Sequence, residues 1–122
     1  MQTGAAVLDK TYLAEAAITL YQVVLLGTAA EQVNVCGAGG LGIGVAQAAQ
    51  GTVDAYVPVR LAGITKVYAG GTVTKGLLQK STSAGRITNV TAAGDRIVGL
   101  ALTTAASGAI ADMLVGAGYY CT

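Results

Sequence analysis

The chain has 122 residues, enough for one domain, and combines 53% apolar residues with only 11% charged residues. Its net charge of +1, without a basic cluster, excludes a nucleic-acid-binding protein, which needs positive charge to neutralise phosphates. Because it has no histidine, two distant cysteines and six scattered acidic residues, we expect no catalysis, no metal site and no cofactor.

The first nine residues, Met1–Asp9, have neither the basic start nor the long apolar core of a signal peptide. We interpret them as an extended arm able to add a strand to the sheet edge of a neighbouring protein. The next segment, Lys10–Ile18, contains good helix formers and predicts a short helix, with an extended segment ordered against a partner as the alternative. Residues 1–17 therefore form an arm followed by a short helix or extended segment.

Short runs of valine, isoleucine, leucine and threonine dominate the rest of the chain, separated by glycine-containing turns roughly every ten residues. This pattern is typical of an all-β barrel or sandwich. The predicted strands are Ile18–Leu26, Gln32–Cys36, Ile43–Ala48, Thr52–Val59, Ile64–Val67, Leu77–Lys80, Ile87–Val90, Ile97–Thr103 and Ala109–Val115.

One uncharged stretch, Gln32–Val53, is 22 residues long, which is the length of a membrane-spanning helix. It contains six glycines and several asparagine and glutamine residues, a poor composition for a spanning helix. We therefore expect no membrane span.

The same stretch contains Gly37-Ala38-Gly39-Gly40-Leu41-Gly42, which matches the glycine pattern of dinucleotide-binding folds. The segment after it is too short for a crossover helix, and no acidic residue follows at the required distance of about 20 positions. We interpret the glycines as a hairpin connection between strands and expect no cofactor.

An internal duplication is the most informative feature. Sliding the chain by 55 residues aligns Ile18–Ala49 with Val73–Thr104, and eight of these 32 positions are identical, including Asn34/Asn89 and Gly44/Gly99. A two-residue insertion would then align Gly51 with Gly108. The sequence thus predicts one domain over residues 1–122, with pseudo-repeats at 18–63 and 73–118, because neither half could bury a core alone.

Three local features have simpler interpretations. The glycosylation pattern Asn89-Val90-Thr91 lacks an export signal, so we expect Asn34 and Asn89 to serve strand or turn geometry. We expect Asp95-Arg96 to be a solvated or locally paired charge couple. The sequence does not decide whether Cys36 and Cys121 form a disulfide.

Two adjacent tyrosines near the C-terminus, Tyr119 and Tyr120, are a third of the aromatic residues. Tyrosine is enriched at protein interfaces, since it combines apolar area with a hydroxyl group. These residues are candidates for a contact role, with capping of a barrel end as the alternative.

Three segments carry a resemblance to a known family: Val59–Val67 (VRLAGITKV), Ala69–Gly76 (AGGTVTKG) and Val98–Leu102 (VGLAL). They resemble the small capsid cement, or decoration, proteins of tailed bacteriophages, and the resemblance extends from about Ala16 to Val115. It implies a compact β-barrel or β-tulip-like domain. It also implies a place on the outside of an icosahedral shell, often as a trimer, without catalysis or a cofactor.

The resulting hypothesis is a structural virion protein that binds the major capsid protein and itself, as a homo-oligomer expected to be a trimer. It would lie on the capsid exterior and pass through the host cytoplasm during assembly. The candidate contact residues are Gln2, Thr3, Gly4, Ala5, Ala6, Val7, Leu8, Tyr119 and Tyr120. The alternative is a small β-sandwich binding module for carbohydrate or for a tail or baseplate assembly, although sugar-stacking tryptophan and phenylalanine are absent.

Overall fold

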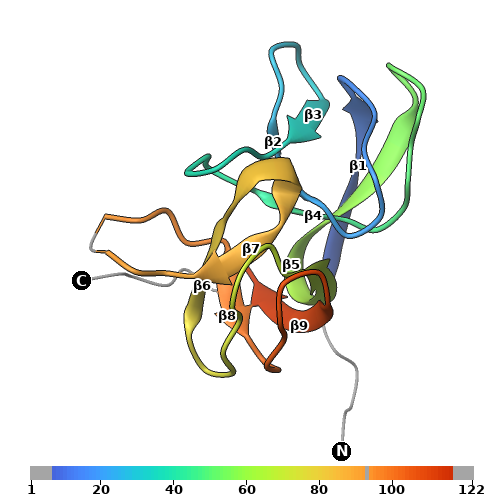
Figure 1. Cartoon of the computed structure of the whole chain (residues 1–122). Coiled ribbons are helices and arrows are strands. Elements are labelled where there is room, and N and C mark those ends of the chain that lie inside the picture. Colours follow the sequence, from blue (N-terminus) through green and yellow to red (C-terminus); the bar gives the residue numbers. More distant parts are fainter. Residues whose placement is uncertain (1–6, 93, 117–122) are drawn as a thin grey trace, which may run out of the picture.

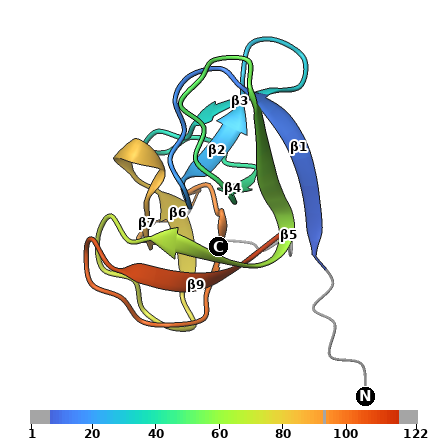
Figure 2. The ribbon, with the colours of Figure 1, turned by 90° about the vertical axis from the view of Figure 1, so that its right-hand side faces the viewer.

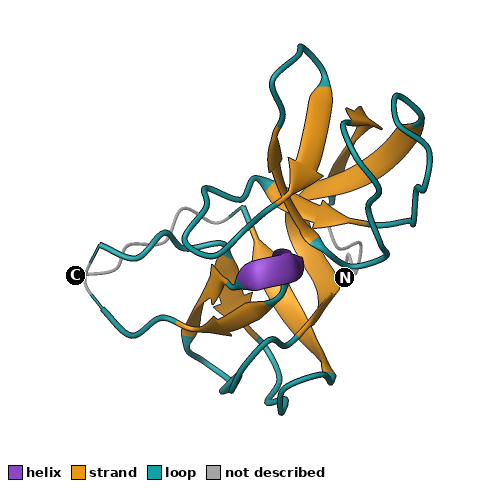
Figure 3. Cartoon of the chain, turned by 45° about the horizontal axis from the view of Figure 1, so that its top comes forward, coloured by secondary structure: helices purple, strands orange, loops and turns teal. Residues whose placement is uncertain are grey.

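The computed structural model describes residues 7–92 and 94–116, and within them it contains nine strands and one short 3₁₀ turn (Figures 1 and 3). The all-β prediction is confirmed. The strands are β1 (Leu8–Ala14), β2 (Val23–Leu26), β3 (Gln32–Val35), β4 (Gly44–Ala46), β5 (Tyr56–Tyr68), β6 (Leu78–Ser81), β7 (Ile87–Asn89), β8 (Gly99–Ala101) and β9 (Ile110–Val115); the turn η1 is Ser83–Gly85.

The first four strands and the first part of β5 form a closed five-stranded barrel, which we call the N-terminal lobe (residues 8–61). Its strand order is β1-β3-β2-β4-β5, and antiparallel pairing of β1 with β5 closes it. Alternate residues point inward, as the period of a strand requires. The buried residues of this lobe's own core cluster are Ala14, Ile18, Val24, Val33, Ala46, Val57 and Val59.

The remaining strands form the C-terminal lobe (residues 63–115). Strand β5 continues into it, where it pairs with β9 from Gly63↔Val115 to Tyr68↔Ile110, followed by β8, β6 and β7. Figure 2 shows β5 bending between the two lobes. The larger core cluster joins them, because it contains Val23 and Val45 from one lobe together with Val67 and Met113 from the other.

The helix predicted for Lys10–Ile18 is wrong, because its first five residues belong to β1. The extended alternative is correct in conformation, but β1 pairs with β5 and β3 of its own chain rather than with a partner. A helix of nine residues is marginal in water, whereas the seam between β3 and β5 provides two sets of backbone partners.

The predicted strands Thr52–Val59 and Ile64–Val67 belong to one continuous strand, β5, which begins only at Tyr56, because residues 52–54 form a bend and turn in which Asp54 has a φ of 64°. The Gly63 between them has a φ of 115°, which glycine adopts without steric cost. The glycine that suggested a turn is the point at which β5 passes from one lobe to the other.

Backbone pairings recur between the lobes at nearly constant spacing. The bridge Ile18↔Gln50 recurs as Val73↔Ala105, and Lys10↔Val59 recurs as Thr65↔Met113. The recurrence therefore begins at β1, upstream of residue 18, and the last strand of the first unit is the beginning of β5.

The residue-by-residue alignment of the two pseudo-repeats, predicted from the sequence, is wrong in two places. Val45↔Arg60 corresponds to Leu100↔Leu114, so β5 and β9 align at a spacing of 54 residues and not after a two-residue insertion. Likewise Val24↔Val35 corresponds to Gln79↔Asn89, so Asn89 takes the place of Val35 and not of Asn34. The hairpin between β6 and β7 is one residue shorter than that between β2 and β3.

Candidate functional site

Most of the predicted contact residues (Gln2, Thr3, Gly4, Ala5, Ala6, Tyr119 and Tyr120) lie outside the described residues. Val7 and Leu8 are described, and they are 48% and 57% exposed. Leu8 pairs with Ala62 and Asp9 pairs with Arg60, so the arm expected over Met1–Asp9 extends no further than Val7.

An ion pair fixes the start of β1 at the junction of the lobes. Arg60 Nε lies 2.9 Å from Asp9 Oδ1 and Arg60 Nη2 lies 3.1 Å from Asp9 Oδ2, while Nη1 donates to Ile64 O at 2.8 Å. The guanidinium hydrogen bond holds the pKa of Asp9 below its usual value, against an opposing effect of burial. Such a two-point contact fixes the orientation of both side chains.

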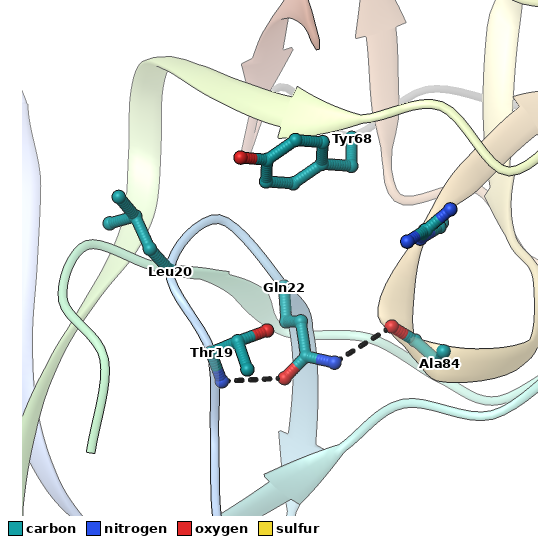
Figure 4. A pocket seen from close by; sticks show the side chains of 6 residues that line it. Thr19, Leu20, Gln22, Tyr68 and Ala84 are labelled. Atoms are coloured by element: carbon teal, nitrogen blue, oxygen red, sulfur yellow. Dashed lines mark hydrogen bonds between the residues drawn. The ribbon is translucent and has the colours of Figure 1, made fainter. Parts of the chain in front are cut away.

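A recess of about 450 Å³ lies between the lobes (Figure 4). Gln22 spans it, because its Oε1 accepts from Thr19 N at 2.8 Å and its Nε2 donates to Ala84 O at 2.9 Å. The residues that line the recess are Thr19, Leu20, Gln22, Tyr68, Ala84 and Arg86. None of these six is a carboxylate, histidine or cysteine, so the recess offers no acid–base pair or activated nucleophile.

The glycine-rich segment 37–42 is a loop between β3 and β4, and no helix follows it. Packing explains two of its glycines: a Cβ on Gly40 would lie 2.8 Å from Cys36 Sγ, and one on Gly42 would lie 2.6 Å from a Val23 methyl group. Gly39 has a φ of 72°, which favours glycine, and a Cβ on Gly37 would meet no atom within 4 Å. The predicted hairpin is wrong, because β3 and β4 pair with opposite edges of β2 and the loop crosses from one to the other.

The remaining polar features are local. Asp95 and Arg96, expected to be solvated or locally paired, bond to different partners. Asp95 accepts from the Thr91 and Ala92 amides, which lower its pKa, and from Lys80 Nζ at 3.2 Å, whereas Arg96 donates to Gly39 O. Asn89 Oδ1 accepts from Thr74 N at 2.9 Å and from Gln79 Nε2 at 2.9 Å, a structural role. Within residues 7–92 and 94–116, no group of three or more acidic, cysteine or histidine residues could hold a metal.

A recess of about 250 Å³ on the N-terminal lobe is lined by apolar residues alone. We call the residues that line it the apolar patch: Leu25, Leu26, Leu41 and Ile43. Leu25 and Ile43 also pack against the core clusters, whereas Leu26 and Leu41 are 59% and 62% exposed. The patch combines the end of β2 with the loop after β3.

Comparison with known proteins adds the decisive observation: a family model described as phage cement protein matches residues 1–116. The chain belongs to the phage cement protein family. No curated protein sequence matches it. Among solved structures, it is similar to the head fiber gp8.5 N base in bacteriophage phi29, with a TM-score of 0.75 and 14% identity over 91% of this chain and 95% of that one.

The family assignment confirms the resemblance found in the sequence and makes this cement protein a structural protein of the phage virion, located at the capsid. The phi29 protein shares its fold. Among the described residues, no helix has the length and apolar character needed to cross a bilayer.

The sequence had not indicated the apolar patch of this cement protein. Leu25 and Leu26 end an apolar run that began at Val23, and two neighbours in a strand point to opposite faces, so they cannot both pack into the same core. That conflict was the available signal for Leu26. Leu41 carried none, since it lies alone in a glycine-rich loop.

Proposed function

We propose that this cement protein binds the outer surface of the icosahedral capsid of a tailed phage and stabilises the shell, without catalysing a reaction. The observation that carries the proposal is the family match over residues 1–116. The proposed partners are the major capsid protein and further copies of the chain in a trimer.

The surface chemistry supports this proposal. Only 11% of the residues are charged, and the two lobes share one buried core cluster, so the molecule offers a rigid and weakly charged surface. Contacts that are weak individually produce strong attachment when an oligomer makes several of them on one shell.

We further propose that the segments flanking the fold, Gln2–Leu8 and Tyr119–Tyr120, contact the capsid or neighbouring copies. Val7 and Leu8 support this for the first segment, because both leave roughly half of an apolar side chain exposed. An extended segment can add a strand to the edge of a partner's sheet through main-chain hydrogen bonds.

Deletion of residues 1–6 tests the role of the arm. It leaves β1 and the Asp9–Arg60 pair intact, so we expect a folded protein with an unchanged melting temperature. Cosedimentation with purified empty capsids should show binding of the full chain and at least about tenfold weaker binding of the truncated chain.

The full chain and a Gly51→Ala variant, altered in an open loop, provide the controls. Equal binding of the truncated and full chains would remove the arm from the proposal. A full chain that does not cosediment with capsids would contradict the proposed function itself. Light scattering of the free protein would test the trimer by its mass.

A further inference from the structure

Because the two lobes repeat the same backbone pairings, the apolar patch of the N-terminal lobe can be compared with the equivalent positions of the C-terminal lobe. The bond from Ile43 N to Val24 O recurs as Val98 N to Gln79 O, and that from Gly40 N to Gly37 O recurs as Asp95 N to Ala92 O. Each position of the apolar patch therefore has a counterpart 55 residues later. The pairs are Leu25 with Lys80, Leu26 with Ser81, Leu41 with Arg96 and Ile43 with Val98.

Three of the four counterparts in the C-terminal lobe, Lys80, Ser81 and Arg96, are polar and make hydrogen bonds, whereas Val98 packs on the core. Lys80 Nζ lies 3.2 Å from Asp95 Oδ2 and 3.1 Å from Thr91 Oγ1. Arg96 donates to Gly39 O at 3.4 Å, and the buried Ser81 hydroxyl donates to Cys36 O at 3.3 Å. The backbone of this unit therefore accepts charged and hydroxyl side chains at these positions.

The two exposed leucines of the patch, Leu26 and Leu41, are consequently not required by the fold. Ser81 is covered by the loop of the other lobe, where Gly39 N donates to Ser81 O at 3.3 Å, whereas its counterpart Leu26 is 59% exposed. A contiguous exposed apolar patch marks a surface that another molecule covers.

The size of the patch indicates what covers it. A stable interface between two proteins takes about 20–30 residues on each side, and this patch has four, so it cannot hold a dimer alone. A small contact of this kind is effective when a repeated lattice engages it many times. None of its four residues is charged, so the matching surface is apolar and uncharged.

We propose that the N-terminal lobe docks through the apolar patch onto an apolar surface of the capsid shell, and that the charged counterparts Lys80 and Arg96 of the C-terminal lobe take no part in this contact. This inference rests on the proposed function, because it names the surface that makes the capsid contact.

The test exchanges the two exposed leucines for their own counterparts, in the double variant Leu26→Ser/Leu41→Arg. We expect its affinity for purified empty capsids, measured by cosedimentation, to fall at least about tenfold, because docking would bury an unpaired guanidinium. The control is Leu77→Gln, which replaces a 47% exposed leucine of the C-terminal lobe by its counterpart, Gln22, and should bind within about twofold of wild type.

Wild-type binding by the double variant, or an equal loss in Leu77→Gln, would overturn the inference while leaving the proposed function intact. Failure of the wild-type chain to bind would contradict the proposed function instead. Loss of oligomer mass in light scattering would show that the patch contacts a second copy and would also overturn the inference. If the double variant has a lower melting temperature than wild type, the single variant Leu41→Ser, altered only in the loop, replaces it. Weaker binding of Leu41→Ser to empty capsids would support the inference, and wild-type binding would overturn it.

Discussion

At the scale of single residues, the contact between Asp9 and Arg60 ties β1 to the strand that passes through both lobes. Both side chains are partly exposed, at 35% and 22%, so solvent weakens the pair and its contribution to stability is modest. The pair matters for geometry, because it holds the start of β1 against β5 at the point where the N-terminal arm leaves the barrel.

The variant Asp9→Asn is therefore expected to be less stable than wild type at pH 7 by no more than about 1 kcal/mol. The pKa of Asp9 is lowered in the folded protein, so the unfolded chain takes up the proton first as the pH falls. The stabilisation is complete above the unfolded pKa of about 3.9 and is lost as the pH falls through the lower folded pKa.

Thermal melts of both proteins between pH 7 and pH 2 would measure this difference, which should shrink below about pH 4. The control is Asp112→Asn, which removes the longer, more exposed pair between Asp112 and Lys66, 3.4 Å apart. A difference that stays constant at low pH would show that the ion pair is not its cause.

At the scale of single elements, the repeat predicts where glycine is indispensable. Gly44 in β4 and Gly99 in β8 occupy equivalent positions, and a Cβ at either would collide with a backbone carbonyl of the next strand, that of Arg60 or Leu114. A collision with backbone cannot be relieved by rotating a side chain. The identity of these two glycines in the sequence thus has a steric cause.

Gly99→Ala and Gly44→Ala should each lower the free energy of unfolding by about 1–3 kcal/mol, the usual effect of overpacking. Chemical denaturation monitored by tyrosine fluorescence would measure it. Gly51→Ala is the matched control, since its Cβ meets no atom within 4 Å, and it should be neutral. Unaltered stability of Gly99→Ala would contradict the steric explanation.

Sequence alone predicted the elements whose pattern is local. The short apolar runs that form β3, β6 and β7 are bounded by turn residues on both sides, and the sequence predicts them to be strands. Strand β1 was not recognised, because Leu13 and Ala14 favour a helix locally and the pairing of β1 with β5, more than forty positions away, is invisible in the sequence. The apolar patch was missed for the same reason: Leu26 and Leu41 come together only through the pairing of β2 with β3 and β4.

At the scale of the whole molecule, the two lobes are held together by more than the continuous strand β5. The larger core cluster takes buried residues from both, and η1 is bound across the junction, where Gly85 N donates to Cys36 O at 3.0 Å. The aromatic rings of Tyr21 and Tyr68, one from each lobe, lie 6.4 Å apart. Neither lobe can open without exposing part of the shared core.

The chain should therefore unfold as a single domain, in one calorimetric transition whose calorimetric and van't Hoff enthalpies agree.

The variant Ile87→Ala, altered at a fully buried residue of the C-terminal lobe, should lower the free energy of unfolding by about 2–5 kcal/mol. Because the core is shared, hydrogen exchange should accelerate in the amides of β2 and β4 as well as in β6. Two transitions, or faster exchange confined to the C-terminal lobe, would show that the lobes are separate domains. If both lobes unfold in one transition, a molecule docked through its N-terminal lobe also holds its C-terminal lobe in place on the shell.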